Sequence, residues 1–359
     1  MDADLTFLME AEPYSVPSET KAPLMARGLE RLTEHHRARG QLYGRMLDAG
    51  WPASPIGSIE AAPWLPVRLF KALELRSIPE EGVFRVMTSS GTTGQAPSRI
   101  FLDLETARLQ TRALSSIATH FLGHRRLPML IVDQPAVLRD RRRYSARTAG
   151  VLGMMNFGRD HLFLLDDDMR LDRATLEAWL ARHAGEDLLI FGFTFMVWND
   201  LLGSLEASPV DLSRATLVHS GGWKKLADQA VSKREFARSL GDALGIATIH
   251  DFYGMVEQVG SVYFECGAGT FHAPNFADVI IRDPVSWEAL GVGRPGVIEV
   301  VSLLPRSYPG HALLTEDMGV LHGEDDCPCG GLGRRFEVLG RIPRAEVRGC
   351  SDTQVRAAA

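Results

Sequence analysis

Residues 88 to 98 read Thr88-Ser89-Ser90-Gly91-Thr92-Thr93-Gly94-Gln95-Ala96-Pro97-Ser98 and crowd hydroxyl groups and glycines into one short loop. Glycines permit close approach of the backbone to a ligand, and exposed N–H groups and hydroxyls donate hydrogen bonds to anionic oxygens. Apolar runs at Val83–Met87 and Arg99–Leu102 predict that the loop joins two strands. The spacing of a Walker loop is absent, and Gln95 stands where a lysine would follow. We interpret the segment as a phosphate-binding loop, the alternative being an ordinary Ser/Thr/Gly turn.

The composition fits an enzyme without a membrane span. The chain has 359 residues, of which 45% are hydrophobic and 23% charged, enough to build one large domain or two. A net charge of -6 argues against a general nucleic-acid partner, which needs a basic face. No apolar run approaches the roughly 20 residues of a membrane helix, and the N-terminus lacks the basic start of a signal peptide. We therefore expect a cytoplasmic protein.

The hydrophobic pattern predicts an α/β fold. Residues 1–80 look helical and loop-rich, with an amphipathic pattern from Thr20 to Met46. Between Val83 and Ile281, short apolar strands alternate with helical segments, which is typical of a sheet with helices packed on it. The clearest strands are 128–132 and 187–193, and the clearest helices are 171–183, 224–240 and the stretch after Phe195. From Val297 onward the pattern favours strands.

Three later segments accompany the hydroxyl-rich loop in a familiar order. They are Tyr253-Gly254-Met255-Val256-Glu257, Thr315-Glu316-Asp317 and Gly340-Arg341. Together with the loop they resemble the phosphate loop, the Y-G-x-[ST]-E segment, the T-x-D segment and the hinge G-R of adenylate-forming enzymes, which make an acyl-AMP from a carboxylate and ATP. The resemblance implies the large N-terminal domain of that superfamily, with mixed sheets, packed helices and a small β-rich subdomain.

The same resemblance implies a role for each segment. The loop residues from Ser89 to Gly94 and Gly254 would surround the nucleotide, and Tyr253 would lie flat against adenine. Glu257 would hold Mg²⁺, a hard cation that prefers carboxylate and phosphate oxygens. Asp317 would accept hydrogen bonds from the ribose hydroxyls, and Arg341 would reach the ribose or a phosphate. Taken singly, these residues fit solvated or half-buried positions equally well. Val256 departs from the family pattern, because it stands where a hydroxyl residue is usual.

Three of the four cysteines predict a metal site. Cys327-Pro328-Cys329-Gly330 is a C-x-C turn that can place two thiolates on one ion, and Cys266 lies upstream with His272 six positions later. In a cytoplasmic protein this clustering favours zinc over disulfides. The pattern resembles the zinc site of phenylacetate-CoA ligase-like enzymes, which implies a structural Cys₃His set of Cys266, His272, Cys327 and Cys329. His311 or His322 could replace His272, and buried thiols without metal remain the alternative.

Six segments spread over the chain share a second, narrower resemblance. They are Pro66–Lys71, Ser98–Asp103 after the loop, Ser145–Arg147, Phe191–Phe193, Gly221–Lys224 and Arg348–Ser351. Together they resemble the LuxE type of acyl-protein synthetase over nearly the whole chain. Members of that family activate a fatty acid with ATP, move the acyl group onto a cysteine near their C-terminus and pass it to a reductase.

The LuxE resemblance implies further site residues. Cys350 would accept the acyl group as a thioester, although on position alone an idle tail cysteine is the simpler interpretation. Gly221, Gly222 and Trp223 would lie along the adenine, and Lys224 would contact phosphate or carboxylate, although Lys224 also fits a solvated helix start. Phe193, Phe195, Met196 and Trp198 are candidates to line an acyl pocket and fit an ordinary core equally well.

The chain stops at Ala359, where most adenylate-forming enzymes continue into a lid domain with a catalytic lysine. We therefore expect that lid to be largely missing and a cation to come from Lys224, Arg341 or Arg348. The expected division is a helical segment at 1–80, a core at 81–339 whose part 264–339 is stapled by zinc, and a hinge and tail at 340–359.

These patterns predict an ATP- and Mg²⁺-dependent acid–thiol ligase that forms acyl-AMP and then a thioester on Cys350 or on a partner. The expected partners are a carboxylic acid substrate and an acyl reductase or acyl-carrier protein. Two alternatives stay open: a ligase for aryl or amino acids that feeds a carrier protein, and a non-catalytic binding protein with the same fold.

Overall fold

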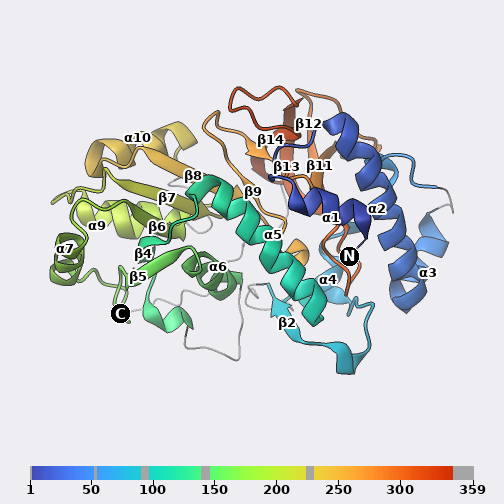
Figure 1. Cartoon of the computed structure of the whole chain (residues 1–359), viewed down its shortest axis with the longest axis horizontal. Coiled ribbons are helices and arrows are strands. Elements are labelled where there is room, and N and C mark those ends of the chain that lie inside the picture. The colour runs from blue at the N-terminus through green and yellow to red at the C-terminus, as the bar shows by residue number, and fades with distance from the viewer. Residues whose placement is uncertain (1, 52–54, 90–96, 139–145, 224–229, 343–359) are drawn as a thin grey trace. The chain divides into compact units, whose positions relative to one another are not determined.

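The computed structural model describes residues 2–51, 55–89, 97–138, 146–223 and 230–342 (Figure 1). By their contacts these residues form two compact units. The first unit combines the described parts of 1–120 and 254–346, and the second unit comprises those of 121–253. The division at residues 80 and 339 that the sequence indicated stays a prediction.

The N-terminal part of the first unit is mainly helical, as expected. Its helices are α1 (Ala3–Glu10), α2 (Ser18–Arg39), α3 (Gln41–Gly50), α4 (Leu69–Ala72) and α5 (Leu104–Leu122), with short 3₁₀ turns at Ile59–Ala61 and Glu80–Gly82. The amphipathic stretch from Thr20 to Met46 is divided at Gly40, which has an extended backbone (φ -102°, ψ 93°). A Cβ at Gly40 would lie 3.0 Å from the carbonyl oxygen of His36, so the chain turns where a side chain would crowd it.

The first unit holds one large antiparallel sheet, with strand order β10-β14-β13-β12-β11. These strands are β10 (Phe271–His272), β11 (Ala277–Arg282), β12 (Pro295–Ser302), β13 (Ala312–Glu324) and β14 (Arg334–Arg341); β9 (Tyr263–Phe264) precedes them in the chain. A short strand, β1 (Leu65–Pro66), pairs with β13 in parallel. Nearly all of β11 and β12 is buried, so this sheet forms the core of the unit. The strand-rich character predicted from Val297 onward is confirmed.

The hydroxyl-rich loop joins two strands, as the sequence predicted. They are β2 (Arg85–Thr88) and β3 (Arg99–Leu102), which pair antiparallel with Thr88 opposite Arg99. The loop is therefore anchored at both ends by one hairpin of the first unit.

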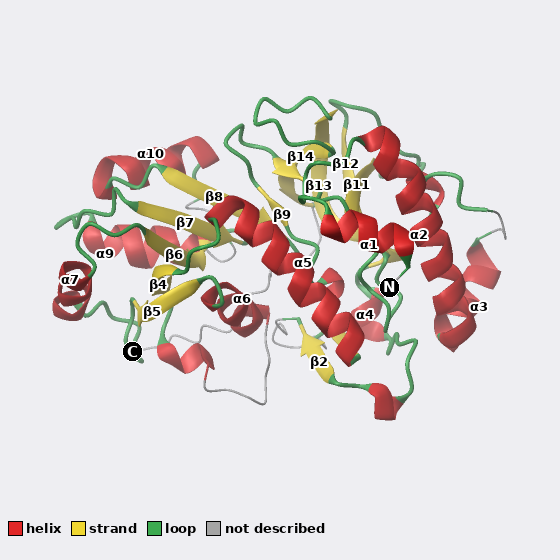
Figure 2. Cartoon of the chain, in the orientation of Figure 1, coloured by secondary structure: helices red, strands yellow, loops and turns green. Residues whose placement is uncertain are grey.

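The second unit contains a parallel sheet, with strand order β5-β4-β6-β7-β8. The strands are β4 (Leu127–Val132), β5 (Gly158–Phe163), β6 (Leu188–Phe193), β7 (Ala215–Ser220) and β8 (Thr248–Tyr253). Helices surround this sheet (Figure 2). They are α6 (Ala146–Met155), α7 (Arg173–Arg182), α8 (Thr194–Met196), α9 (Gly203–Leu205) and α10 (Lys233–Leu244), with a π-helical turn at Val197–Leu202 and a 3₁₀ turn at Pro135–Leu138. The α/β alternation and both predicted buried strands are confirmed.

One helix of the second unit starts later than predicted. The pattern indicated a helix from Lys224 to Leu240, whereas α10 begins at Lys233. Residues 230–232 are not helical, and residues 224–229 lie outside the described part of the chain. Ser232 explains the start, because its hydroxyl accepts a hydrogen bond from the backbone N–H of Glu235 at 3.1 Å, an N-cap that satisfies a free helical donor.

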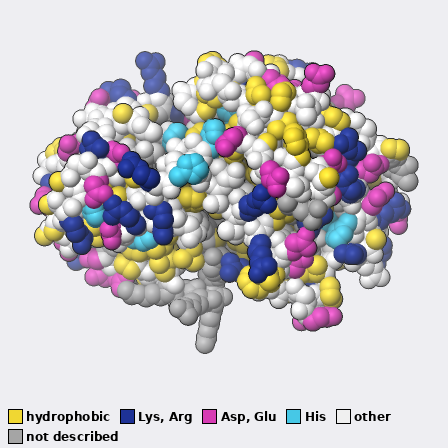
Figure 3. Space-filling model, in the orientation of Figure 1, with side chains coloured by type: hydrophobic (Ala, Val, Ile, Leu, Met, Phe, Trp, Pro, Cys, Tyr) yellow, Lys and Arg dark blue, Asp and Glu magenta, His cyan; other side chains and the backbone are white. Residues whose placement is uncertain are grey.

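Basic and acidic side chains are interspersed over the face shown in Figure 3, in keeping with the modest net charge. Within the described residues, none of the helices has both the length and the apolar character that a membrane crossing requires.

Candidate functional site

Strand pairing brings two of the predicted signatures together in the first unit. Asp317 on β13 lies opposite Arg341 on β14, with Arg341 Nε 3.7 Å from Asp317 Oδ1. Thr315 fixes this part of β13, because its hydroxyl donates to the carbonyl oxygen of Ile298 at 2.8 Å and accepts from the N–H of Asp317 at 3.1 Å. The T-x-D and G-R segments thus place an acid and a cation on neighbouring strands.

Glu257 lies in a buried 3₁₀ turn (Val256–Gln258) of the same unit, and only 7% of its surface is exposed. Burial raises the pKa of its carboxyl group, while the nearby Ser98 hydroxyl and the charges of Lys71 and Arg341 oppose that rise. Gln258 holds the turn, because its side-chain amide donates to the carbonyl oxygens of Val300 and Gly310. A buried acid close to two cations and a hydroxyl is an arrangement that can bind a metal–phosphate complex.

The hydroxyl-rich loop is closed at its base. The N–H of Ser89 donates to the carbonyl oxygen of Ser98 at 3.2 Å, and the N–H of Ser98 donates to the Ser89 hydroxyl at 2.8 Å. Ser89 and Ser98 therefore hold the two ends of the loop together. The remaining predicted phosphate ligands, Ser90, Gly91, Thr92, Thr93 and Gly94, lie outside the described residues.

The second unit positions the predicted adenine-binding turn after β7. Gly221 has φ +83°, a left-handed conformation that favours glycine, and its carbonyl oxygen accepts a hydrogen bond from the Thr194 hydroxyl. Trp223 meets Trp198 edge to face at 5.5 Å between ring centroids. Gly222 lies between these two residues of the turn, while Lys224 is outside the described residues.

The remaining predicted residues of the second unit are buried or half-buried. Tyr253 ends β8 and is half-buried, and the chain enters the first unit again at Gly254. Phe193 and Met196 lie in the core, whereas Phe195 and Trp198 are half-buried. The lining of an acyl pocket by these four residues stays a prediction.

Sequence reasoning gave no role to His219, which lies next to the predicted adenine-binding turn. It is buried on β7, with its Nδ1 3.0 Å from the Thr194 hydroxyl and 3.6 Å from a carboxylate oxygen of Asp251. Burial lowers its pKa to about 3, so the ring is neutral at physiological pH. Its place two residues before Gly221 was the only available signal.

The four predicted zinc ligands meet in the first unit. The ligand atoms of Cys266, His272, Cys327 and Cys329 all lie within 4.8 Å of one another. Cys266 Sγ is 3.8 Å from Cys327 Sγ, and Cys329 Sγ is 3.5 Å from His272 Nε2. A tetrahedral ion with Zn–S bonds of about 2.3 Å separates its sulfurs by about 3.8 Å, so the residues fit zinc.

The surroundings of the Cys266 sulfur fit a metal-binding thiolate, whereas burial raises the pKa of the Cys329 thiol to about 12. Backbone N–H groups of Ala268 and Gly331 donate to Cys266 Sγ at 3.4 Å and Cys329 Sγ at 3.3 Å. Although burial alone would raise the pKa of the Cys266 thiol, hydrogen bonds from His272 and from the backbone hold it at about 5. Cys327 lies in the same turn as Cys329, between β13 and β14.

The two alternative histidine ligands have other partners. His311 Nε2 lies 3.0 Å from the Thr33 hydroxyl, and His322 Nε2 lies 3.0 Å from Glu337. The structure therefore favours His272 in the Cys/His cluster, as we name Cys266, His272, Cys327 and Cys329.

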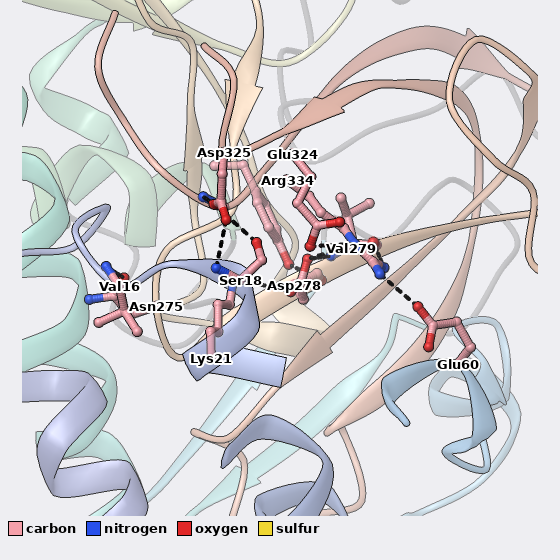
Figure 4. Close-up of polar contacts among 12 residues, drawn as sticks. Val16, Ser18, Lys21, Glu60, Asn275, Asp278, Val279, Glu324, Asp325 and Arg334 are labelled. Atoms are coloured by element: carbon pink, nitrogen blue, oxygen red, sulfur yellow. Dashed lines mark hydrogen bonds and ion pairs between the residues drawn. The ribbon is translucent and has the colours of Figure 1, made fainter. Parts of the chain in front are cut away.

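An ionic network joins the N-terminal helices to the sheet next to the Cys/His cluster (Figure 4). Lys21, which is 1% exposed, places its Nζ 3.1 Å from an oxygen of Asp278, and Arg334 bonds Glu60 at 2.7 Å. Asp325, at the start of the cysteine-bearing turn, accepts hydrogen bonds from the backbone N–H groups of Ser18 at 2.8 Å and Gly333 at 2.7 Å. The turn that carries two of the cysteines is thus tied directly to the start of α2.

The fold has close counterparts among solved structures. An open conformation of 2-hydroxyisobutyryl-CoA ligase in complex with 2-HIB-AMP and CoA superposes with a TM-score of 0.70 at 17% identity, covering 92% of this chain and 76% of that one. The same enzyme in its postadenylation state gives a TM-score of 0.70 at 17% identity, covering 92% and 70%. The likeness shows that the chain has the fold of adenylate-forming enzymes, as the sequence predicted.

The sequence comparisons cover nearly the whole chain. A family model described as "Acyl-protein synthetase, LuxE" matches residues 2–358. Two proteins named "Long-chain-fatty-acid--luciferin-component ligase" are each 21% identical to this chain. The one from Vibrio harveyi aligns over 97% of this chain and 91% of its own length, and the one from Aliivibrio fischeri over 97% and 92%. The chain therefore belongs to the LuxE family of acyl-protein synthetases and is a ligase with the adenylate-forming fold.

Proposed function

We propose that this chain uses ATP to convert a fatty acid into an acyl-AMP and then transfers the acyl group to a thiol, that of Cys350 or of a partner protein. The observation that carries the proposal is that Arg341 lies beside Asp317 in the first unit and that its charge also acts on the buried carboxyl group of Glu257. The names of the relatives support a long-chain fatty acid as the substrate.

Each half of the reaction breaks one bond for each bond that it forms. A carboxylate oxygen of the acid attacks the α-phosphorus of ATP, the bond from that phosphorus to the bridging oxygen breaks, and pyrophosphate leaves. A thiolate then attacks the acyl carbon, the bond to the phosphate oxygen breaks, and AMP leaves, while the thiol proton goes to solvent. Both attacks depend on aligning two anionic groups that repel each other in water.

The described residues supply that alignment in our proposal. Glu257 would hold Mg²⁺, which neutralises phosphate charge when bound. Asp317 accepts hydrogen bonds from the ribose hydroxyls, and Arg341 binds the ribose or a phosphate. Gly221, Gly222, Trp223 and Tyr253 accommodate the adenine, with Ser89, Gly254 and the loop beyond Ser89 around the phosphates. Lys224 and Cys350 lie outside the described residues and keep the roles that the family resemblance implies.

We also propose that the Cys/His cluster holds a structural zinc ion. Its four donors fill a tetrahedral shell, which leaves no position for a substrate. The ion would connect β10 with the turn between β13 and β14 and so support the strand pair that carries Asp317 and Arg341.

ATP–pyrophosphate exchange tests the first half of the proposal. The protein is incubated with ATP, Mg²⁺ and labelled pyrophosphate, together with aliphatic acids of increasing length, aryl acids or amino acids. Exchange that requires a long-chain fatty acid supports the proposal. Exchange with aryl or amino acids only would indicate a ligase that feeds a carrier protein, and absence of exchange with every acid would indicate a binding protein.

Mass spectrometry of the intact protein tests the second half. After incubation with ATP and the active acid, the wild type should gain one acyl group that hydroxylamine removes, and Cys350→Ala should not. Exchange should be unchanged in Cys350→Ala, because the thiol acts only after acyl-AMP has formed. Exchange without acylation of the wild type would assign the thiol to a partner such as an acyl reductase.

A further inference from the structure

Lys71, the last residue of the Pro66–Lys71 segment, is a cation to which no role was assigned from the sequence. Lys71 in α4 is half-buried, and its charge acts on the Glu257 carboxylate together with that of Arg341. Lys71 is included in the sequence analysis only within the Pro66–Lys71 segment. The cation that assists the reaction is expected there to be Lys224, Arg341 or Arg348.

The backbone before Lys71 is attached to the strand that leads to Asp317. Leu65 and Pro66 pair in parallel with Leu313 and Leu314 of β13, and the N–H of Val67 donates to the carbonyl oxygen of Leu314 at 2.9 Å. The guanidinium of Arg68 then bonds Glu316 Oε1 through Nε at 2.9 Å and Nη2 at 2.6 Å. The chain entering α4 therefore follows β13 up to the residue before Asp317.

The other side of α4 is fixed by the core around Glu257. Phe70 is 1% exposed and meets Tyr308 edge to face at 6.0 Å between ring centroids. Tyr308 accepts a hydrogen bond from Gln110 at 3.5 Å; burial raises the pKa of its hydroxyl, and the charge of the Glu257 carboxylate adds to that rise. α4 also packs against β3, which begins directly after Ser98. The position of α4, which carries Lys71, is thus set by β13, by β3 and by the packing of Phe70 on Tyr308.

We propose that the Lys71 ammonium group binds phosphate oxygens of ATP in a site that it forms with Glu257, Ser98 and Arg341. The inference rests on the proposed function, because it assigns the cation for that reaction. ATP brings several negative charges into a site where the Glu257 carboxylate is itself negative. Cations fixed in the first unit are therefore needed to hold the ATP phosphates. Lysine suits this role, since its ammonium group carries a compact charge and can donate three hydrogen bonds to phosphate oxygens in different directions.

Kinetics of three variants test the inference. Lys71→Met removes the charge and keeps the apolar stem, Lys71→Gln removes the charge and keeps polarity, and Lys71→Arg keeps the charge. Arg27→Ala is the matched control, because it removes a cation from α2 that pairs with Asp4 on the surface of the same unit. Exchange rates are measured against ATP and acid concentration, and folding is checked by the melting temperature.

We expect kcat/KM for ATP to fall about 10- to 100-fold in Lys71→Met and Lys71→Gln, as for loss of one charged hydrogen bond. KM for the acid and the melting temperature should stay near those of the wild type, and Lys71→Arg should recover part of the loss. Arg27→Ala should match the wild type.

The inference is overturned if both neutral variants keep wild-type kcat/KM for ATP while the wild type exchanges normally. It is also overturned if Lys71→Arg loses as much activity as Lys71→Met and all three variants melt earlier, which would indicate a structural role. Failure of the proposed function is a different result, in which the wild type itself exchanges with no acid.

Discussion

The Cys/His cluster and the Glu257 site lie in the same unit but differ in the kind of groups that they gather. The cluster brings together three sulfurs and one imidazole nitrogen, all of which can bind one metal ion and fill its tetrahedral shell. The Glu257 site mixes a buried acid with Lys71, Arg341 and the Ser98 hydroxyl. The four donors of the cluster can all bind a single ion, whereas the charged groups of the Glu257 site can bind a charged substrate. The comparison predicts that the cluster governs stability and the Glu257 site governs catalysis.

The largest expected effect comes from breaking the cluster. In Cys327→Ser, zinc content should fall from about one ion per chain to well below half, and the first unit should lose several kcal/mol of stability, since metal binding contributes directly to folding. A loss of about 4 kcal/mol corresponds to a drop in melting temperature of roughly 10 °C.

Elemental analysis and thermal unfolding of purified protein check this prediction. Cys350→Ser is the control, because it removes a thiol that lies outside the cluster, and it should keep both the metal and the melting temperature. Wild-type protein that contains no zinc, or a Cys327→Ser variant as stable as the wild type, would contradict a structural metal.

The next effect separates activity from stability at Glu257. Glu257→Gln should reduce exchange about 100-fold through loss of the metal ligand. Burial raises the pKa of this carboxyl group in the folded state above its pKa in the unfolded chain. As pH rises from the lower pKa through the higher one, ionisation of Glu257 therefore destabilises the folded state increasingly. The variant should therefore gain stability relative to the wild type as pH rises from 4 to 8.

Exchange assays and unfolding curves over that pH range measure both quantities. A stability difference that shrinks as pH rises would show that Glu257 is stabilised in its charged form. Full exchange activity in Glu257→Gln would remove the residue from the reaction.

The smallest effect concerns the Asp317–Arg341 pair. Asp317→Asn should raise KM for ATP about 10-fold, because an amide accepts ribose hydroxyls less strongly than a carboxylate. Stability should change by less than about 1 kcal/mol, since the ion pair is long at 3.7 Å and partly exposed. Asp242→Asn, which removes an exposed acid of α10, is the control for charge alone. An Asp317→Asn variant with wild-type KM and a large loss of stability would make the pair structural instead.

Local patterns allowed much of this architecture to be predicted. The strands β4 and β6 are buried apolar runs, and the C-x-C turn announces two ligands within three residues. The hairpin around the hydroxyl-rich loop followed from the apolar runs on both sides of it. In each case neighbouring residues carry the signal, so one sequence is enough to detect it.

The features that sequence reasoning missed depend on distant contacts. β1 is a two-residue strand whose partner lies in β13, and this pairing fixes the start of the segment that leads into α4 and Lys71. The start of α10 at Lys233 depends on one capping hydroxyl, whereas the helical pattern extends further back. The break between α2 and α3 lies at Gly40, where a side chain would crowd the His36 carbonyl oxygen, and the hydrophobic periodicity does not record this contact.

The first unit is built from two stretches of chain separated by the whole second unit. During synthesis, strands β10 to β14 emerge after the parallel sheet, so α1 to α5 can pack on their sheet only once the second unit has been synthesised. The contiguous second unit can form its core earlier.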